Sequence, residues 1–534
     1  MYDKERGLYI AHCDEGNLAI NGKMANRHGL IAGATGTGKT VTLQVMAETF
    51  CQAGVPCFMA DMKGDLSGIS KAGSMSGFIE KRKGEFGIDN PMFEGCPVRF
   101  YDVFGQQGHP IRATISQMGP QLLSRLLGLN ETQDGVLNIV FRIADEKGLL
   151  ILDLKDLRSM LDYVSKHAKE YTTKYGNISS ATVGAIQRSL LQLENQGANQ
   201  FFGEPSFDIH DLLQTEGGKG VMSVLAADRL MMQPKLYSTF LLWLISELYS
   251  TLPEVGDQEL PKLVFFFDEA HMLFEDTSKA LVDKIEQVIR LIRSKGVGIY
   301  FISQLPTDIP DNILGQLGNR VQHALRAYTP RDQKAVKVAA ETFRANPAFK
   351  TEEAITTLET GEALVSFLDE KGAPGIVQRA KILFPLSQIG AITDSERRDI
   401  MNRSTIGHKY DTMVDNISAY EMLMQEEEEQ NLPAESETEV AQGNSGNKAT
   451  AKKKTGIGAK IFKSIITAVT ATVATAAGTA VSDAVTGKKT KSKTSTKQKV
   501  IKNATSAATR TASREILNGG GSIMRDILGN IINK

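Results

Sequence analysis

The chain has 534 residues, of which 41% are hydrophobic and 23% are charged, as is typical of a soluble protein with a large core. Its formal net charge of −1 gives no electrostatic argument for nucleic acid as a partner of the whole molecule, so such an argument needs a local segment. The four cysteines lack C-x-x-C spacing, which argues against a metal site and favours a reducing compartment. The first residues, Met-Tyr-Asp-Lys-Glu-Arg, lack the apolar run of a signal peptide, so we expect a cytoplasmic protein.

The first segment predicts an antiparallel pair of strands at an edge of a sheet. Residues 8–20 contain two short apolar runs, separated by the turn-forming sequence Asp-Glu-Gly. This hairpin would lead the chain into the first core strand.

A phosphate-binding loop follows at residues 28–40, His-Gly-Leu-Ile-Ala-Gly-Ala-Thr-Gly-Thr-Gly-Lys-Thr. It matches G-x-x-x-x-G-K-[ST], with an apolar run before it and a helix-forming run, residues 41–50, after it. Glycines let the backbone turn its N–H groups inward, and the new helix directs its positive dipole end at the anion. The residues expected to hold the nucleotide are Gly33, Ala34, Thr35, Gly36, Thr37, Gly38, Lys39 and Thr40.

Two side chains of this loop have specific roles in such a site. Lys39 would reach the β- and γ-phosphates, and Thr40 would place its hydroxyl on Mg²⁺. The sequence therefore predicts a nucleoside triphosphate site with ATP and Mg²⁺ as cofactors.

The next strands end in polar residues. Residues 55–60 form a buried strand that ends at Asp61, Lys63 and Asp65. Polar residues at the carboxyl ends of strands in an open α/β sheet lie in the ligand crevice, so these three are candidates for the site. A solvated turn is the alternative. Further strands are predicted at 98–103 and 111–116.

From residue 117 to residue 216 the apolar pattern changes to helical spacing. Helices are predicted at 121–129, 135–147, 154–171 and 181–194, and we interpret this segment as an inserted helical subdomain. A strand at 220–225 and a long apolar helix at 235–252, with the only tryptophan, then resume the core.

A second anchor is the sequence Lys-Leu-Val-Phe-Phe-Phe-Asp-Glu-Ala-His at 262–271. Its apolar run predicts a central strand, and two carboxylates at a strand end need a cation or hydrogen-bond partners. This pattern is typical of a Walker B strand, in which Asp268 holds the Mg²⁺ shell and Glu269 orients or deprotonates the attacking water. The second acid favours hydrolysis that drives motion. His271 is either structural or a relay to the γ-phosphate.

A helix at 278–295 and a strand at 298–302 follow. The strand ends in Gln304, which can hydrogen-bond both the γ-phosphate and the water without adding negative charge. We therefore expect Gln304 to be a sensor of the nucleotide, with a polar loop residue as the alternative.

The chain resembles the HerA/FtsK superfamily, and within it the bacterial HerA-like ATPases of the YjgR type. The resemblance covers roughly residues 2–403. It rests on the loop at 28–40, Asp-Glu-Ala-His at 268–271, Arg-Leu-Ile-Arg-Ser-Lys-Gly-Val-Gly at 290–298, Ser-Gln-Leu-Pro at 303–306 and the strand predicted at 319–326. It implies a RecA-like core, a homo-hexameric ring with ATP sites between subunits, and translocation on double-stranded DNA.

A ring ATPase supplies a cation across the subunit interface to the developing charge on the γ-phosphoryl group. Arg293 matches the family position for this role and ranks first, and Arg326, on the strand predicted at 319–326, ranks second. Ordinary surface arginines are the alternative. Beyond them, a helix at 332–343 and closing strands at 361–368 and 375–381 complete the predicted core.

The C-terminal part has an uneven charge. Residues 404–450 predict a helix and an acidic linker, and residues 451–514 carry fourteen Lys or Arg against one acid, so the rest of the chain is near −14. This tail suits DNA phosphates or an anionic membrane surface. Residues 465–485 are long enough to span a bilayer, but their Thr and Ala favour an amphipathic or packing helix.

The predicted fold is α/β: a RecA-like P-loop NTPase core with a helical insertion and a partly disordered C-terminal tail. The predicted parts are the core at 1–116 and 217–403, the insertion at 117–216, the helix and linker at 404–450 and the tail at 451–534. The leading function is a ring translocase or helicase on double-stranded DNA. The alternatives are an ATPase that remodels a protein or membrane-associated complex, and a nucleotide-regulated binding protein with little turnover.

Overall fold

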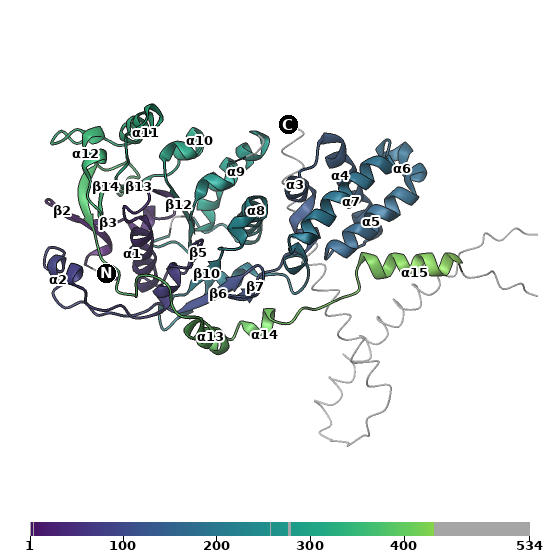
Figure 1. Cartoon of the computed structure of the whole chain (residues 1–534), viewed down its shortest axis with the longest axis horizontal. Helices are drawn as coiled ribbons and strands as arrows, with labels where there is room; N and C mark the ends of the chain where they lie inside the picture. The colour runs from purple at the N-terminus through teal and green to yellow at the C-terminus, as the bar shows by residue number, and fades with distance from the viewer. Residues whose placement is uncertain (1, 4, 257, 276–278, 432–534) are drawn as a thin grey trace, which may run out of the picture. The chain divides into compact units, whose positions relative to one another are not determined.

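The structure is a computed structural model, and it describes residues 2–3, 5–256, 258–275 and 279–431 (Figure 1). The tail predicted at 451–534 and most of the acidic linker lie outside these residues, so the predictions of a DNA or membrane partner for the tail stay predictions. No helix in the described ranges is long and apolar enough to cross a bilayer.

Thirteen strands of the described chain form one mixed sheet, in which β4 lies between β13 and β12, and β12 lies between β4 and β11. Pairing is parallel from β13 through to β7 and antiparallel from β13 back to β1. The carboxyl ends of β4, β12 and β11 therefore meet at one edge, as a RecA-like core requires. In sheet order, the strands are β1 (Tyr2–Asp3), β2 (Gly7–Cys13), β15 (Gln378–Ile382), β14 (Glu362–Ser366), β13 (Asn319–Gln322), β4 (Gly29–Ala32), β12 (Val297–Ser303), β11 (Leu263–Phe267), β5 (Cys57–Asp61), β10 (Met222–Ala226), β6 (Val98–Asp102) and β7 (His109–Pro110), with β3 (Gly16–Ile20) paired to β2.

The parallel strands are buried on both faces because helices cover both. Alternate strand residues such as Ile31 and Phe266 pack with α1 on one face, whereas Leu30 and Phe265 pack with α8 and α9 on the other. The described helices are α1 (Lys39–Gln52), α2 (Gly77–Arg82), α3 (Ile115–Leu127), α4 (Glu131–Lys147), α5 (Leu154–Lys166), α6 (Ala168–Tyr175), α7 (Ser180–Asn195), α8 (Pro234–Thr251), α9 (Lys279–Ile292), α10 (Asp311–Leu314), α11 (Pro330–Glu341), α12 (Thr351–Thr357), α13 (Asp394–Arg403), α14 (Gly407–Tyr410) and α15 (Ala419–Asn431).

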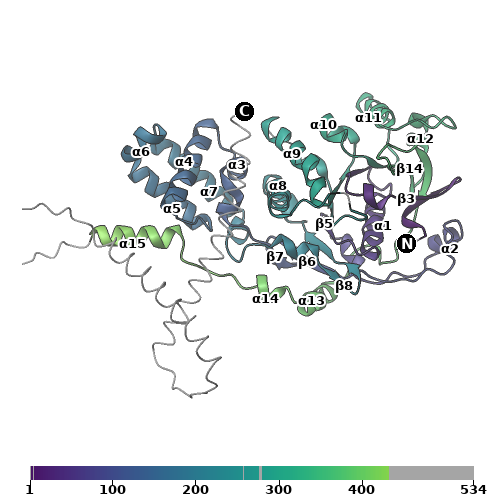
Figure 2. The ribbon, with the colours of Figure 1, turned by 180° about the vertical axis from the view of Figure 1, so that it is seen from behind.

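The helices between β7 and β8 (Thr215–Glu216) pack on one another, as the helical spacing predicts. Both views show α4, α5, α6 and α7 as one group (Figures 1 and 2). α3 contacts both α4 and α8, and their apolar side chains belong to one continuous hydrophobic cluster. α3 therefore joins this helical group to the helix layer on the sheet. A small hairpin of β8 and β9 (Lys219–Gly220) precedes β10.

Three sequence predictions about these elements are wrong. Residues 111–116 contain no strand, because the side chain of Thr114 accepts a hydrogen bond from the Gln117 N–H and starts α3 at Ile115. The helix predicted at 154–171 is two helices, since the backbone leaves helical geometry at His167. The strand predicted at 319–326 ends at Gln322, because the chain then turns and Leu325 N–H donates to Ile355 O.

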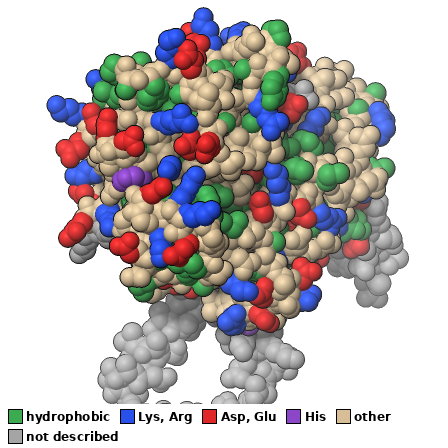
Figure 3. Space-filling view, turned by 60° about the vertical axis from the view of Figure 1, so that its left-hand side comes forward, with side chains coloured by type: hydrophobic (Ala, Val, Ile, Leu, Met, Phe, Trp, Pro, Cys, Tyr) green, Lys and Arg blue, Asp and Glu red, His purple; other side chains and the backbone are tan. Residues whose placement is uncertain are grey.

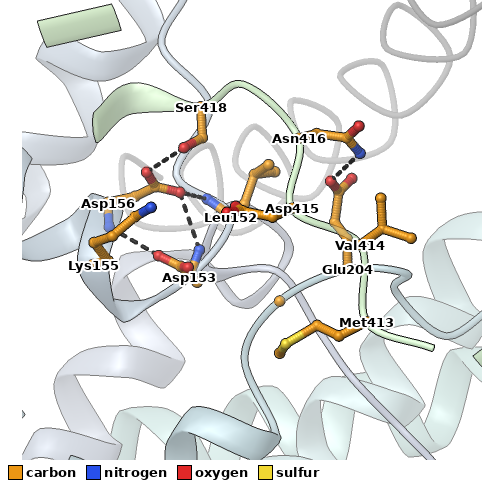
Figure 4. Close-up of a pocket in the computed structure, with 11 residues that line it drawn as sticks. Leu152, Asp153, Lys155, Asp156, Glu204, Met413, Val414, Asp415, Asn416 and Ser418 are labelled. Atoms are coloured by element: carbon orange, nitrogen blue, oxygen red, sulfur yellow. Dashed lines mark hydrogen bonds between the residues drawn. The ribbon is translucent and has the colours of Figure 1, made fainter. Parts of the chain in front are cut away.

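The segment after β15 runs back along the molecule and is held at several points. The Arg397 guanidinium lies 4.3 Å from the centre of the Phe100 ring, and Arg112 donates to Tyr410 O at 2.8 Å. Farther on, Ser418 donates its hydroxyl to Asp156 at 2.5 Å (Figure 4). This segment thus bonds both to the sheet and to the helical group.

Candidate nucleotide-binding site

The phosphate-binding loop has the predicted strand–loop–helix form, from β4 through the glycines into α1. Gly33 and Gly38 have positive φ values of 153° and 111°. A Cβ on Gly33 would also lie 2.5 Å from the Cβ of His323, so both the conformation and the close approach require glycine there. The N-terminus of α1 then faces the hollow of the loop, where backbone N–H groups and the helix dipole favour an anion.

Lys39, the first residue of α1, turns its side chain back over the loop. Its ammonium donates to Gly33 O at 2.6 Å and to Ala34 O at 3.1 Å. Partial burial lowers the pKa of Lys39, while the nearby carboxylates of Glu269 and Asp268 act in the opposite direction. Lys39 therefore belongs to the same charge cluster as the two acids.

Asp268 follows β11, whose five residues are all buried. Burial and, to a smaller extent, the adjacent Glu269 raise the pKa of Asp268 to about 6, although the Glu269 N–H and the charges of Lys63 and Lys39 act in the opposite direction. A buried carboxylate beside a second carboxylate is costly without a cation. Thr40 lies next to Lys39 at the start of α1, so a hydroxyl and a carboxylate suited to Mg²⁺ flank the same loop.

Glu269 is held in an unusual way. Its φ of 48° is in the left-handed region, which is uncommon for a residue other than glycine. Its N–H donates to Asp268 Oδ1 at 2.9 Å, whereas its own Oε2 is buried and accepts no hydrogen bond from any described residue. His271 Nδ1 lies 3.4 Å from that oxygen, close enough for an ion pair when the ring is protonated. An unpaired buried carboxylate oxygen fits a site that receives a water molecule or metal shell.

Gln304 lies at the same edge of the sheet. It follows Ser303, which pairs with Ala32 of the P-loop strand and accepts a hydrogen bond from the Gly33 N–H at 3.3 Å. The Gln304 side chain is exposed. Its position next to the loop is the one expected of a sensor.

The two arginines lie at opposite ends of the parallel strands: Arg293 at the amino end of β12, and Arg326 at the carboxyl end of β13. Arg293 begins the 3-10 turn (Arg293–Lys295) that precedes β12, and its carbonyl accepts a hydrogen bond from Asn26, just before β4. Since β12 has seven residues, Arg293 is about 20 Å from its own loop along the strand direction. Arg326 lies beyond β13 at the loop edge, two residues after Ala324, whose carbonyl accepts from the Ala34 N–H. Both arginine side chains are exposed.

The three polar residues predicted after β5 do not act together. The charge of Lys63 reaches both Asp268 and Lys39, so Lys63 belongs to the cluster. Asp61 is buried instead and accepts the Leu66 N–H at 3.2 Å. Burial raises the pKa of Asp61 to about 6, although the charge of Arg397 lowers it. Asp65 precedes a short 3-10 helix (Leu66–Ser70) and makes no capping hydrogen bond.

The structure adds two residues that sequence spacing did not identify. His323 is buried against the loop, where its ring is within hydrogen-bond distance of Thr42 Oγ1 and Glu362 O. Tyr237 of α8 donates its hydroxyl to Asp268 O at 3.1 Å. Neither residue is part of a local pattern, because each meets the site only through the tertiary fold.

A separate pocket of about 190 Å³ lies between the start of α5 and the segment before α15 (Figure 4). Asp156 faces it and accepts N–H groups of Leu152 and Tyr420 as well as the Ser418 hydroxyl. Glu204 similarly accepts from Asn416. No residue of the phosphate-binding loop lines this pocket. Its polar groups hold the C-terminal segment in place.

The fold and the loop geometry together define a RecA-like P-loop NTPase whose residues fit a triphosphate with Mg²⁺. The chain belongs to the family described as "Helicase HerA-like C-terminal", which matches residues 8–534. It is therefore a HerA-like P-loop ATPase, as its motifs predict.

Two curated relatives are similar over a shorter stretch. Both are called DNA double-strand break repair helicase HerA, one from Sulfolobus acidocaldarius (30% identical over 99 residues) and one from Sulfurisphaera tokodaii (32% over 108 residues). The matched stretches are 18% and 20% of this chain and 19% and 20% of those proteins. The similarity thus spans about a fifth of the relatives' length.

Solved structures with a similar arrangement include the bacterial conjugative coupling protein TrwBΔN70 and VirB4 of Thermoanaerobacter pseudethanolicus. TrwBΔN70 is 14% identical with a TM-score of 0.46, covering 73% of this chain and 92% of its own. VirB4 is 15% identical with a TM-score of 0.46, covering 72% of this chain and 98% of its own. TrwB has also been solved with an ATP analogue and with ADP and Mg²⁺.

Proposed function

We propose that this protein binds ATP with Mg²⁺, hydrolyses it, and uses the energy to move on double-stranded DNA as a ring of identical subunits. The observation that carries the proposal is the single charge cluster of Lys39, Asp268 and Glu269 at the mouth of the loop. A binding protein without turnover has no need for the second acid, since Asp268 alone can support the metal shell.

The roles of the individual residues follow from their positions. Backbone N–H groups within residues 35–40 would donate to the phosphates, because those of Gly33 and Ala34 already donate to Ser303 O and Ala324 O. Lys39 would exchange its loop carbonyls for phosphate oxygens. Asp268 and Thr40 would hold Mg²⁺, which neutralises charge on the β- and γ-phosphates. Glu269 accepts a proton from the attacking water with its unpaired oxygen, and Gln304 donates to the γ-phosphate.

The arginine positions support a ring. Arg293 lies at the amino ends of the strands, whereas its own loop lies at their carboxyl ends, so Arg293 can serve a nucleotide only in a neighbouring subunit. Arg326 lies beyond the carboxyl end of β13, near its own loop, and its side chain is exposed. In either case the cation proposed to complete the site is an exposed arginine and not a buried residue. A hexamer is the ring size that the family resemblance implies.

Double-stranded DNA is proposed as the substrate because the chain is HerA-like and two relatives carry the name of a DNA repair helicase. The face in Figure 3 shows basic and acidic side chains intermixed rather than one large basic surface. The face in that view therefore offers no large basic surface to DNA, whereas the basic segment at 451–514 has the charge that phosphate contacts need.

The test compares ATP hydrolysis by the full chain with and without duplex DNA. We expect hydrolysis that duplex DNA stimulates, and a fall of about a hundredfold or more in Lys39→Ala, because no other loop side chain supplies a cation. Lys371→Ala, at an exposed turn, is the matched control and should behave as the wild type. Normal hydrolysis in Lys39→Ala would overturn the site. Hydrolysis that duplex DNA leaves unchanged would instead favour remodelling of a protein complex.

A further inference from the structure

The strand order fixes the direction in which a bound nucleotide extends. Asp268 and Glu269 follow β11, which lies two strands from β4 on the β12 side. A γ-phosphate that meets these acids points toward that side. The sugar and base must then leave the loop toward β13 and β14, on the other side of β4.

Gly361, just before β14, marks the surface on that side. Its N–H donates to Thr37 O of the loop at 3.3 Å. A Cβ on Gly38 would lie only 3.5 Å from the Gly361 nitrogen. Whatever borders Gly361 therefore also borders the start of α1, where the sugar and base emerge.

Two side chains of α2 border Gly361. A Cβ on Gly361 would lie 3.2 Å from Arg82 Nη1 and 3.9 Å from Phe78 Cζ. The Arg82 guanidinium stacks on the Phe78 ring with its carbon 4.5 Å from the ring centre. A stacked pair of an aromatic ring and a guanidinium thus lies beside the loop.

Neither side chain of this stacked pair has all of its surface or hydrogen-bonding groups covered by described residues. Phe78 is 51% exposed although it is a large apolar residue. The Arg82 guanidinium covers only one side of the Phe78 ring, and its buried Nη1 finds no hydrogen-bond acceptor among the described residues. An exposed ring supported by a guanidinium is a surface on which a heteroaromatic base can stack.

We propose that Phe78 and Arg82 form the binding site for the purine base of the nucleotide. The base stacks on the exposed part of the Phe78 ring, as bases stack on aromatic side chains, and the Arg82 guanidinium holds the ring in place by stacking on it. This inference rests on the proposed function, since it assigns the base of the same ATP whose phosphates the loop holds. It also gives α2 a role that its sequence does not indicate.

The test measures dissociation constants of the full chain for ATP and for inorganic triphosphate, which lacks a base. We expect Phe78→Ala to weaken ATP binding about 5- to 150-fold and to leave triphosphate binding unchanged. Phe78→Tyr should retain ATP affinity because it keeps the ring. The matched control is Met92→Ala. The Met92 side chain is 82% exposed and lies, like α2, in the segment that connects β5 to β6, so this variant should bind both ligands normally.

The outcomes separate this inference from the proposed function. If wild type binds ATP and Phe78→Ala binds it equally well, the base site is elsewhere. Equal weakening of ATP and triphosphate, or a change in sedimentation that accounts for the lost affinity, would show that Phe78 supports the loop or a subunit contact instead. If wild type binds neither ligand, the nucleotide site itself is wrong.

Discussion

At the scale of single residues, the strongest feature is the pair of acids after β11. Burial and mutual repulsion raise the pKa of Asp268 to about 6, and Glu269 carries an unpaired buried oxygen on a backbone with φ of 48°. Each of these is unfavourable in the free protein. A divalent cation beside Asp268 would compensate its buried charge, and a water molecule beside Glu269 would satisfy the oxygen that lacks a hydrogen bond.

Glu269→Gln should therefore separate binding from hydrolysis. The amide keeps the shape of the side chain but accepts no proton, so we expect kcat to fall about 10²- to 10⁴-fold with little loss of ATP affinity. Steady-state kinetics and equilibrium binding on the same preparation measure the two effects. Glu370→Gln, on an exposed turn, serves as the control. Wild-type turnover in Glu269→Gln would remove Glu269 from the role of base.

At the scale of elements, α1 is attached to the chain after β15 through a buried carboxylate. Glu48 of α1 accepts the N–H groups of Leu386 at 2.8 Å and Ser387 at 3.0 Å, as well as the Ser387 hydroxyl. Burial nevertheless raises the pKa of Glu48 from 4.5 to about 7. The helix that starts at the P-loop thus contains a group that titrates near neutral pH.

This contact predicts a pH-dependent stability. Because the folded chain holds the Glu48 proton more tightly than the unfolded chain, stability falls as pH rises from about 4.5 to about 7, by up to about 3 kcal/mol. Glu48→Gln, which does not titrate, should lose this contribution. Thermal midpoints at pH 5.5 and pH 8 measure it, and wild type should lose more stability between them than the variant. Identical pH profiles would contradict the assignment.

At the scale of the whole molecule, the question is which group completes the site from a second subunit. Arg293 and Arg326 are exposed at opposite ends of the parallel strands, so a ring would bring only one of them to a neighbouring loop. The sequence ranks Arg293 first, and its distance from its own loop is compatible with action across an interface. The location of Arg326 near its own loop leaves it the second candidate.

Mixing variants tests this directly. Arg293→Ala or Arg326→Ala should reduce hydrolysis about 10³- to 10⁵-fold if the residue acts across the interface. Mixing that variant with Lys39→Ala should restore part of the activity, since a mixed interface pairs an intact loop with an intact arginine. A mixture in which the Lys39→Ala chain also lacks the arginine is the control without recovery. Full activity of a single arginine variant, or of a sedimenting monomer, would end its assignment.

The sequence predicted the elements whose signals are local. The loop at 28–40 needs only a strand, glycines and a helix start in succession, and the run Phe-Phe-Phe-Asp-Glu at 265–269 identifies a buried strand with its acids. It failed at 111–116 and at 154–171, where a capping interaction and a local break decided the backbone. At 111–116 a short apolar run suits a strand or the start of a helix, so periodicity alone could not distinguish them, and at 154–171 a helical period does not record a single non-helical residue.

The sequence by itself thus determined which residue types stand at the strand ends: a phosphate loop, two adjacent acids and a glutamine, whose roles stay predictions. Only the tertiary structure decided which groups meet. It inserted β12 between β4 and β11, directed Lys63 to the cluster but Asp61 to Arg397, and placed Phe78 and Arg82 beside Gly361. The physical reason is that strand order and chain reversals bring together residues hundreds of positions apart, and no local spacing records such contacts.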